Sequence, residues 1–267
     1  MEIVCDTNVW YHLGQNPPTE DFLSKHKLIG TFHSIDELSR TPNLLKHPEV
    51  TRKAIQALMT YSKGTIYEPP LVYLKRLDNP RFFFNPAQEL LPILQFTKLV
   101  AKGHDIAEEK ADAFKAHCQK RRDDLKLAAD SFNSTAAAIK PNIKDKKKHR
   151  KEDSIPANRA FISMCVQLRT KDTELSNSFD WSQIELFENV LKVVFNDLET
   201  GAIVLKENDW FDLFNMIYVT PQRKYWTADT KWVNIIKRAG MEKYLFVPET
   251  EEAKENSDKL VTSEEKK

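Results

Sequence analysis

Four acidic residues have the types and positions that could do chemistry in this chain. They are Asp6, Glu37, Asp212 and Asp229. Each stands where a predicted strand ends or the helix beyond it begins, and in parallel α/β sheets that edge is where sites form. Carboxylates gathered there repel one another unless a cation lies between them, and Mg²⁺ or Mn²⁺ prefers such oxygen ligands. The sequence therefore predicts a metal-dependent enzyme that hydrolyses phosphodiester bonds.

The elements that must position these acids alternate between strands and helices at both ends of the chain. Strands are predicted at 2–5, 28–32, 225–227 and 244–247. Helical patterns separate them, beginning near Ser34 and covering 48–63, 209–219 and 231–239. This alternation predicts an α/β fold of three αβα layers with a mainly parallel sheet. The N-terminal strand and the strand before Asp229 should lie in that same sheet.

The order and setting of the acids resemble the PIN-domain nucleases. The matching segments are Asp6-Thr7-Asn8, Glu37, Asp212 and Thr227-Ala228-Asp229. The resemblance covers roughly residues 1–45 and 200–247. It implies a PIN-like fold, a metal site formed by the four acids, cleavage of single-stranded RNA and products with 5′-phosphate ends. By analogy with this family, a protein inhibitor or antitoxin is a candidate partner.

The middle of the chain is longer than such a core requires. The domain prediction is a nuclease core at 1–69 and 200–247, interrupted by a mostly helical insertion at 70–199. The insertion contains a basic loop at 140–153, and a charged tail at 248–267 is predicted to be disordered.

Two features inside this plan are predicted from composition. The proline- and aromatic-rich stretch from Glu68 to Pro92 is predicted to form a long ordered loop or a set of short turns. Gly64 reads as the stop of the helix over 48–63.

Three of the four acids also have a structural interpretation. Asp6 could cap the next helix. Glu37 stands three residues after Ser34, which is the spacing of a capping box, and Asp36 is its neighbouring alternative. Asp212 could favour the positive end of its own helix.

Three nearby residues could assist the acids. Asp209 shares a helical face with Asp212 and is a candidate ligand of a second metal ion or a hydrogen-bond partner of the ligands. Asn8 could orient Asp6, although helix capping explains it almost as well. Thr227 could donate a hydrogen bond to a phosphate or an aspartate.

Basic residues are the candidates for binding the RNA backbone. One group lies in the basic loop and another flanks the last acid: Lys146, Lys147, Lys148 and Arg150, and Arg223, Lys224 and Lys231. The loop could equally be an ordinary solvated tip. Aromatic residues interleaved with the basic residues around Asp229 could stack on unpaired bases or belong to the core.

Composition sets the remaining limits. The 40 lysines and arginines nearly balance the 39 aspartates and glutamates, so only local clusters could attract nucleic acid. Three cysteines without a CxxC pattern fit a reducing cytoplasm and give no zinc site. No membrane span or signal peptide is expected.

Two further function classes stay open. A degenerate nuclease fold could bind RNA or protein without catalysis. Another acid-dependent α/β phosphohydrolase is the other class, although Asn8 stands where the haloacid-dehalogenase type needs a second aspartate.

Overall fold

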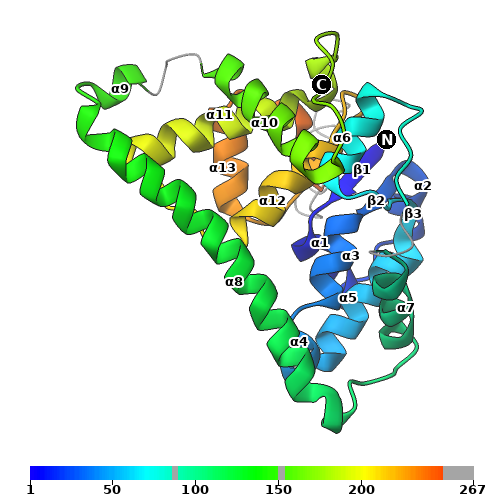
Figure 1. Ribbon diagram of the computed structural model, residues 1–267. Coiled ribbons are helices and arrows are strands. Elements are labelled where there is room, and N and C mark those ends of the chain that lie inside the picture. Colours follow the sequence, from blue (N-terminus) through cyan, green and yellow to red (C-terminus); the bar gives the residue numbers. More distant parts are fainter. Residues whose placement is uncertain (86–89, 150–153, 249–267) are drawn as a thin grey trace, which may run out of the picture.

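A four-stranded parallel sheet forms the framework of the fold (Figure 1). The computed structural model describes residues 1–85, 90–149 and 154–248. The strands are β1 (Glu2–Cys5), β2 (Lys27–Thr31), β3 (Ser62–Ile66) and β4 (Arg223–Trp226), in the order β3-β2-β1-β4. All three pairings are parallel, and β1 pairs directly with β4. The predicted α/β class and the shared sheet of the first and last strands are confirmed.

Alternating residues of the strands face two separate cores. On β1, Ile3 and Cys5 pack into one apolar cluster, whereas Val4 packs into the other. On β4, Tyr225 and Trp226 divide between the clusters in the same way. Because side chains alternate across a strand, helices must cover both faces of the sheet. The result is three layers with the sheet in the middle.

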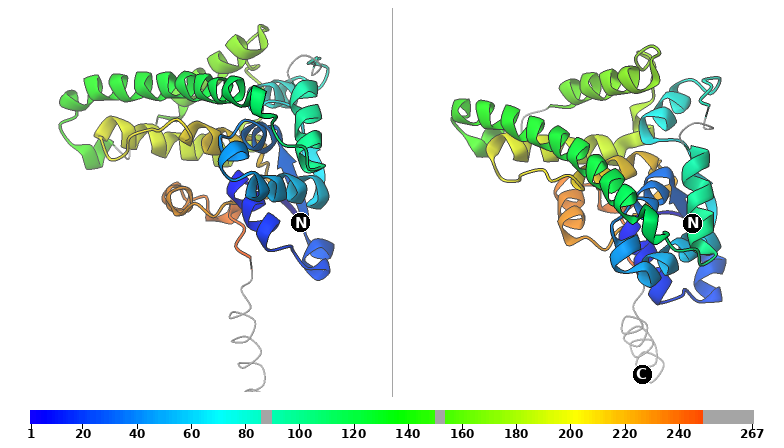
Figure 2. Two further views of the ribbon diagram at one scale, coloured as in Figure 1. Left: turned by 90° about the horizontal axis from the view of Figure 1, so that it is seen from below. Right: turned by 60° about the horizontal axis from the view of Figure 1, so that its bottom comes forward.

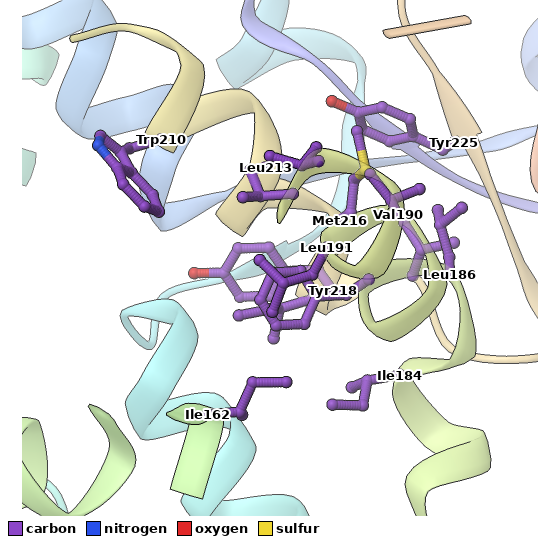
Figure 3. Close-up of a cluster of buried hydrophobic side chains, with 14 of the residues drawn as sticks. Ile162, Ile184, Leu186, Val190, Leu191, Trp210, Leu213, Met216, Tyr218 and Tyr225 are labelled. Carbon is purple, nitrogen blue, oxygen red and sulfur yellow. The ribbon is translucent and has the colours of Figure 1, made fainter. Parts of the chain in front are cut away.

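The first face is covered by helices close to the N-terminus. They are α1 (Thr7–Gln15), α2 (Glu20–Lys25), α3 (Phe32–Ser39), α4 (Asn43–Lys46), α5 (Pro48–Tyr61) and α7 (Leu90–Ala101). The second face is covered by α6 (Pro70–Asp78), α10 (Ile155–Thr170), α11 (Glu185–Thr200), α12 (Asp209–Asn215) and α13 (Thr230–Arg238). Figure 3 shows part of this second core, where side chains of α11 and α12 gather beside Tyr218 and Tyr225.

The longest helix, α8 (Glu108–Ile139), runs along one side of the molecule (Figures 1 and 2). Its middle is tied to the second layer: Arg122 forms an ion pair with Glu207 at 3.0 Å, and the Asn133 amide exchanges hydrogen bonds with the backbone of Leu205. Beyond it come the short turn η1 (Lys140–Asn142) and α9 (Lys146–His149). None of the helices in the described residues is both long and apolar enough to span a membrane.

The helix α11 links the predicted insertion to the predicted core. It lies within 70–199, yet it packs against α12 and α13 as well as against α8 and α10. Its stripe of buried residues includes Leu186, Val190 and Val194. The second layer of the sandwich is therefore built from both parts of the chain.

Four local predictions differ from the structure. Gly64 lies within β3 and does not end a helix, because α5 stops at Tyr61 and the chain continues directly as an edge strand. The loop predicted from Glu68 to Pro92 contains α6, which begins at Pro70 because proline suits the first turn of a helix. The strand predicted at 244–247 is reduced to one parallel bridge between Leu245 and Tyr225. Part of the basic loop forms the helix α9. Nearly all of the predicted tail, 249–267, lies outside the described residues.

Gly14 marks the closest approach of two helices in the first layer. A Cβ atom at this position would lie 2.6 Å and 2.7 Å from the carbonyl carbon and oxygen of Lys53 and 2.8 Å from the amide nitrogen of Ala54. These are backbone atoms of α5, which cannot move aside cheaply. Glycine therefore allows α1, the helix that follows Asp6, to pack tightly against α5.

Gly14→Ala gives a test in which the sign of the change is informative. In an uncrowded helix this substitution would stabilise by about 1 kcal/mol through helix propensity. Here overpacking costs about 1–3 kcal/mol, and the short contacts with immobile backbone place the cost high in that range. We expect a net decrease in the free energy of unfolding, measured by urea denaturation. Thr60→Ala, at an exposed position of α5, is the control and should change it by less than about 0.5 kcal/mol. A more stable Gly14→Ala variant would show that the helices are not in close contact.

Candidate acidic site at the sheet edge

The parallel pairing of β1 with β4 places Asp6 beside Thr227. Cys5 and Trp226 are partners in register, and the backbone N–H of Asp6 donates to the carbonyl of Trp226 at 2.9 Å. The Thr227 hydroxyl then donates to Asp6 Oδ2 at 2.9 Å. These two segments, more than 200 residues apart in sequence, thus meet at the carboxyl edge of the sheet, as predicted.

Asp6 is buried and serves two purposes. Its Oδ1 accepts the backbone N–H of Thr7 at 2.7 Å, so the capping interpretation is correct for α1. The same carboxylate faces the other acids, because a proton-mediated hydrogen bond joins it to Asp212. Capping and membership of an acidic cluster are therefore compatible.

Glu37 reaches the cluster and does not cap its helix. The N-cap of α3 is Thr31, whose hydroxyl accepts the N–H of Ser34 at 3.2 Å, so Ser34 lies inside the helix. Glu37 instead lies one turn further along, where its side chain is hydrogen-bonded to Thr7 and feels the charge of Asp6. Its neighbour Asp36 faces elsewhere and pairs with Arg40 at 3.1 Å.

Asp212 and Asp229 complete the group from the other side. The indole N–H of Trp232, a fully buried residue of α13, donates to Asp212 Oδ2 at 2.7 Å. Asp229 caps α13 by accepting the N–H of Lys231 at 2.7 Å, and its charge acts on both Asp6 and Asp212. The structure therefore brings all four predicted acids together from four different elements.

The electrostatics of the cluster are dominated by burial. Burial raises the pKa of Asp6 to about 6, despite the hydrogen bonds from Thr227 and Thr7 that lower it. Burial also raises the pKa of Glu37 to about 7, and the charge of Asp6 adds to the rise. For Asp212, burial and then the charges of Asp6 and Glu37 raise the pKa to about 9. At neutral pH Asp212 therefore holds a proton and donates it to Asp6.

The cluster is not closed around a metal ion. Among residues 1–85, 90–149 and 154–248, no group of three or more His, Cys, Asp or Glu side chains is arranged as a ligand set. The raised pKa of Asp212 favours its protonated form, which reduces the repulsion between the carboxylates. The donor set nevertheless fits a hard divalent cation. It consists of carboxylate oxygens with free lone pairs, and their negative charge, once ionised, would need a positive partner.

Two of the predicted assisting residues do not contact the acidic cluster in the way expected. Asp209 Oδ2 accepts the N–H of Lys206 at 2.8 Å, and Oδ1 forms an ion pair with Lys231. Asp209 therefore balances a lysine next to the cluster and does not join the carboxylates. Asn8 is exposed on α1, and the residue of this helix that contacts Glu37 is Thr7.

Two of the predicted substrate-binding residues lie at the wrong end of the sheet. Arg223 is in register with Glu2 at the amino end of the strands and pairs with it at 2.9 Å. It also donates to Tyr73 and to the carbonyl of Tyr218. Lys224 donates to the carbonyl of Lys243. Both side chains have structural partners. Residues at the start of a parallel strand lie at one edge of the sheet, and residues that follow the strand lie at the opposite edge. Lys231 alone of this group lies beside the acids.

The basic segment lies far from the acids. Lys146, Lys147 and Lys148 are exposed on α9, and Arg150 lies outside the described residues. Helix α9 stands at the far end of α8 (Figure 1). From Arg121, which lies near the cluster, α8 runs a further 25–30 Å or so to its end at a rise of about 1.5 Å per residue.

Sequence reasoning missed three residues at the site. Thr7 was visible only as part of the opening motif, and Trp232 stands three residues after Asp229, which places both on one side of α13. Arg121 had no sequence signal. It pairs with Asp36, lies over the ring of Phe211 at 4.2 Å from the centroid, and its positive charge opposes the rise in the pKa of Glu37.

Comparisons with protein-family models, curated proteins and solved structures found no match for this chain.

The raised pKa values predict how stability depends on pH. A carboxyl group with a higher pKa in the folded state binds its proton more tightly there, so its stabilising effect is complete at low pH. That effect is lost as pH rises through the folded value. For Asp212 the loss extends from about pH 4 to about pH 9, at up to about 1.4 kcal/mol per pH unit. We expect the melting temperature in EDTA to fall across this window and to fall less steeply in Asp212→Asn.

The control for this experiment is Asp112→Asn. Asp112 is exposed on α8, and in the described part of the chain it forms an ion pair with Lys115. This variant should keep the wild-type pH profile. If Asp212→Asn shows the same slope as wild type, Asp212 does not hold a proton in the folded protein.

Proposed function

We propose that this chain is a metal-dependent endoribonuclease that hydrolyses phosphodiester bonds of single-stranded RNA. The observation that supports it best is the meeting of Asp6, Glu37, Asp212 and Asp229 at the carboxyl edge of a parallel sheet. Burying several acids together is costly, and a fold keeps such an arrangement when it binds cations or handles protons. The order of the acids is that of the PIN-domain nucleases, which adds the substrate class.

The cofactor in this proposal is Mg²⁺ or Mn²⁺, held by the four carboxylates. When bound, such an ion lowers the pKa of a bound water and stabilises charge on phosphate oxygens. Release of the proton shared by Asp6 and Asp212 would make both groups available as ligands. Binding should therefore compete with protonation and tighten as pH rises.

The chain's own residues have separate tasks. Thr227 and the N–H of Thr7 hold the Asp6 carboxylate in place, and Trp232 does the same for Asp212. Glu37, with a pKa of about 7, is in part ionised at neutral pH and can accept a proton from a water at the cluster. Lys231 and Arg121 supply positive charge at the border of the site, where phosphate groups of the strand would pass.

One observation favours a non-catalytic alternative. The carboxylates are not closed into a ligand set, and a degenerate nuclease fold that only binds RNA or protein would look the same. Another acid-dependent phosphohydrolase is the other alternative. Under the nuclease proposal, the three free cysteines fit a reducing cytoplasmic location, and a protein inhibitor or antitoxin is a candidate partner.

Asp6→Asn tests the proposal directly. The variant keeps the shape of the side chain but removes one negative charge from the cation site. We expect wild-type protein to cleave single-stranded RNA with Mg²⁺ or Mn²⁺ and to stop in EDTA. We expect Asp6→Asn to lose at least about 100-fold in rate, since changing groups that merely support metal ligands already costs about 10–100-fold. Asp112→Asn serves again as the matched control.

The other outcomes separate the alternatives. RNA that is retained in a gel-shift assay but not cleaved would support the non-catalytic binder. Release of phosphate from p-nitrophenyl phosphate without RNA cleavage would support the other phosphohydrolase. If Asp6→Asn cleaves as fast as wild type, the activity does not come from this cluster.

Neutralising the basic segment on α9 tests where the strand runs. The variant Lys146→Gln, Lys147→Gln, Lys148→Gln should bind a strand of about 16 nucleotides or more less tightly and with a weaker salt dependence. Each lost contact with a single strand lowers the slope of log K against log salt by about 0.7. An oligonucleotide of about four nucleotides should bind unchanged, because α9 is remote from the acids. Equal weakening for both lengths would contradict this path.

A further inference from the structure

A cavity of about 270 Å³ lies beside the acidic cluster, between α8, α10 and α12. Its walls are apolar and largely aromatic, and include Phe132, Phe161, Trp210 and Phe211. The rings brace one another: Phe132 lies 4.8 Å from Trp210 and 5.5 Å from Phe161, measured between centroids. Pockets for drug-sized ligands run from about 300 to 1,000 Å³. This one therefore suits a single flat ring system.

Three nitrogens of residues that line the cavity have no hydrogen-bond partner in the described structure. They are both ring nitrogens of His33 and the indole nitrogen of Trp210, and all three are buried. Figure 3 shows the indole nitrogen of Trp210 turned away from Leu213 and the core. A buried polar group without a partner is costly, and such groups in folded proteins call for an explanation. None of the three nitrogens is exposed on the cavity wall, which is apolar throughout, so a ligand in the cavity contacts aromatic and aliphatic surface only.

His33 lines the cavity as a neutral side chain. Burial and the positive charge of Arg121 lower its pKa to about 3. The charged groups around it are Arg121 from α8 and, one turn along α3, Glu37. The aromatic rings therefore supply the contact, because stacking on aromatic side chains is available to every base.

The cavity is next to the acids along three elements. His33 and Glu37 are four residues apart on α3 and so lie on one face, about 5–6 Å apart at Cβ. Phe211 directly precedes Asp212 on α12. Arg121, lying over the ring of Phe211, stands at the boundary, and its charge acts on both His33 and Glu37. Along this path the aromatic cavity comes first, then the Arg121 guanidinium and then the carboxylates. In a nucleic-acid strand, a base, its phosphate and the bond to be cleaved follow one another in the same order.

We propose that this cavity binds one unpaired nucleobase of the strand and so fixes where the backbone is cleaved. The inference rests on the proposed nuclease function and extends it to a base-binding subsite. The Arg121 guanidinium, held by Asp36, contacts the backbone phosphate between that base and the acids. A double-stranded substrate is excluded, because its bases are stacked and cannot enter.

Filling the cavity is the test. The test variant is Ala128→Phe, because Ala128 on α8 lines the cavity. The control is Leu127→Phe, at the neighbouring position, where the side chain is 72% exposed. Cys165→Phe fills the cavity from α10 and replaces Ala128→Phe if that variant does not fold. The substrates are a single-stranded RNA and a series of the same strand with one abasic residue at successive positions.

In wild type and Leu127→Phe, one abasic position should lower cleavage by roughly 10- to 100-fold, the effect of losing one stacked base. In Ala128→Phe, cleavage of the intact strand should fall by a similar factor, and that abasic position should have no further effect. Equal cleavage of every abasic strand by wild type overturns the proposal. So does wild-type behaviour of Ala128→Phe.

A binding measurement separates failure of this inference from failure of the nuclease proposal. Uridine and adenosine monophosphates, titrated into Asp6→Asn, should quench tryptophan fluorescence, and the quenching should be absent in Ala128→Phe and in Trp210→Phe. This result supports a base-binding cavity even if no cleavage is found. Binding of indole, an apolar ring without phosphate, measured by calorimetry, together with binding of neither nucleotide, would show that the cavity takes another class of ligand and would overturn the proposal.

Discussion

The repulsion between carboxylates buried at one edge of the sheet is the constraint on which the rest of this structure depends. Asp6, Glu37 and Asp212 all have raised pKa values, and burial is the first cause for each. Without a cation, the cluster avoids the cost by keeping a proton between Asp6 and Asp212. The hydrogen bonds from Thr227, Thr7 and Trp232 hold the groups together in spite of their charge. A packed scaffold on both faces of the sheet has to supply the stability that the cluster itself does not provide.

That scaffold explains why the helical part of the chain matters to the site. Helix α8 brings Arg121 to the border of the cluster, and α11 packs behind α12, which carries Asp212. The guanidinium is the chain's own positive charge beside Glu37, and it is fixed by Asp36 on α3. The predicted insertion is therefore more than a separate appendage, because it contributes charge to one side of the site and support to the other.

The sequence allowed the meeting of the acids to be predicted better than their surroundings. Asp6, Asp212 and Asp229 each stand at a strand end or helix start, and local patterns show such positions. Parallel pairing then brings them together without further information. The prediction for Arg223 and Lys224 was wrong. They are close to Asp229 in sequence, but the four-residue strand β4 carries the chain from one edge of the sheet to the other before Asp229 is reached. Arg121 could not be found, because its position depends on the path of a helix packed against residues far away in sequence. The strand β3 was missed because Ser62-Lys63-Gly64-Thr65 has little apolar character, as is common at a sheet edge.

The same constraint would link stability to the proposed activity. A proton between Asp6 and Asp212 favours the fold without a cation, whereas a cation bound as proposed would require that proton to leave. The two states therefore compete for the same oxygens, and rising pH shifts the balance from the proton toward the cation. Glu37, whose pKa of about 7 lies between those of Asp6 and Asp212, is the group whose charge changes closest to neutral pH. Under the proposed function such a site has low charge at rest and would gain ligands as a cation enters, so the fold could gather four acids at one sheet edge and still fit a hard metal ion.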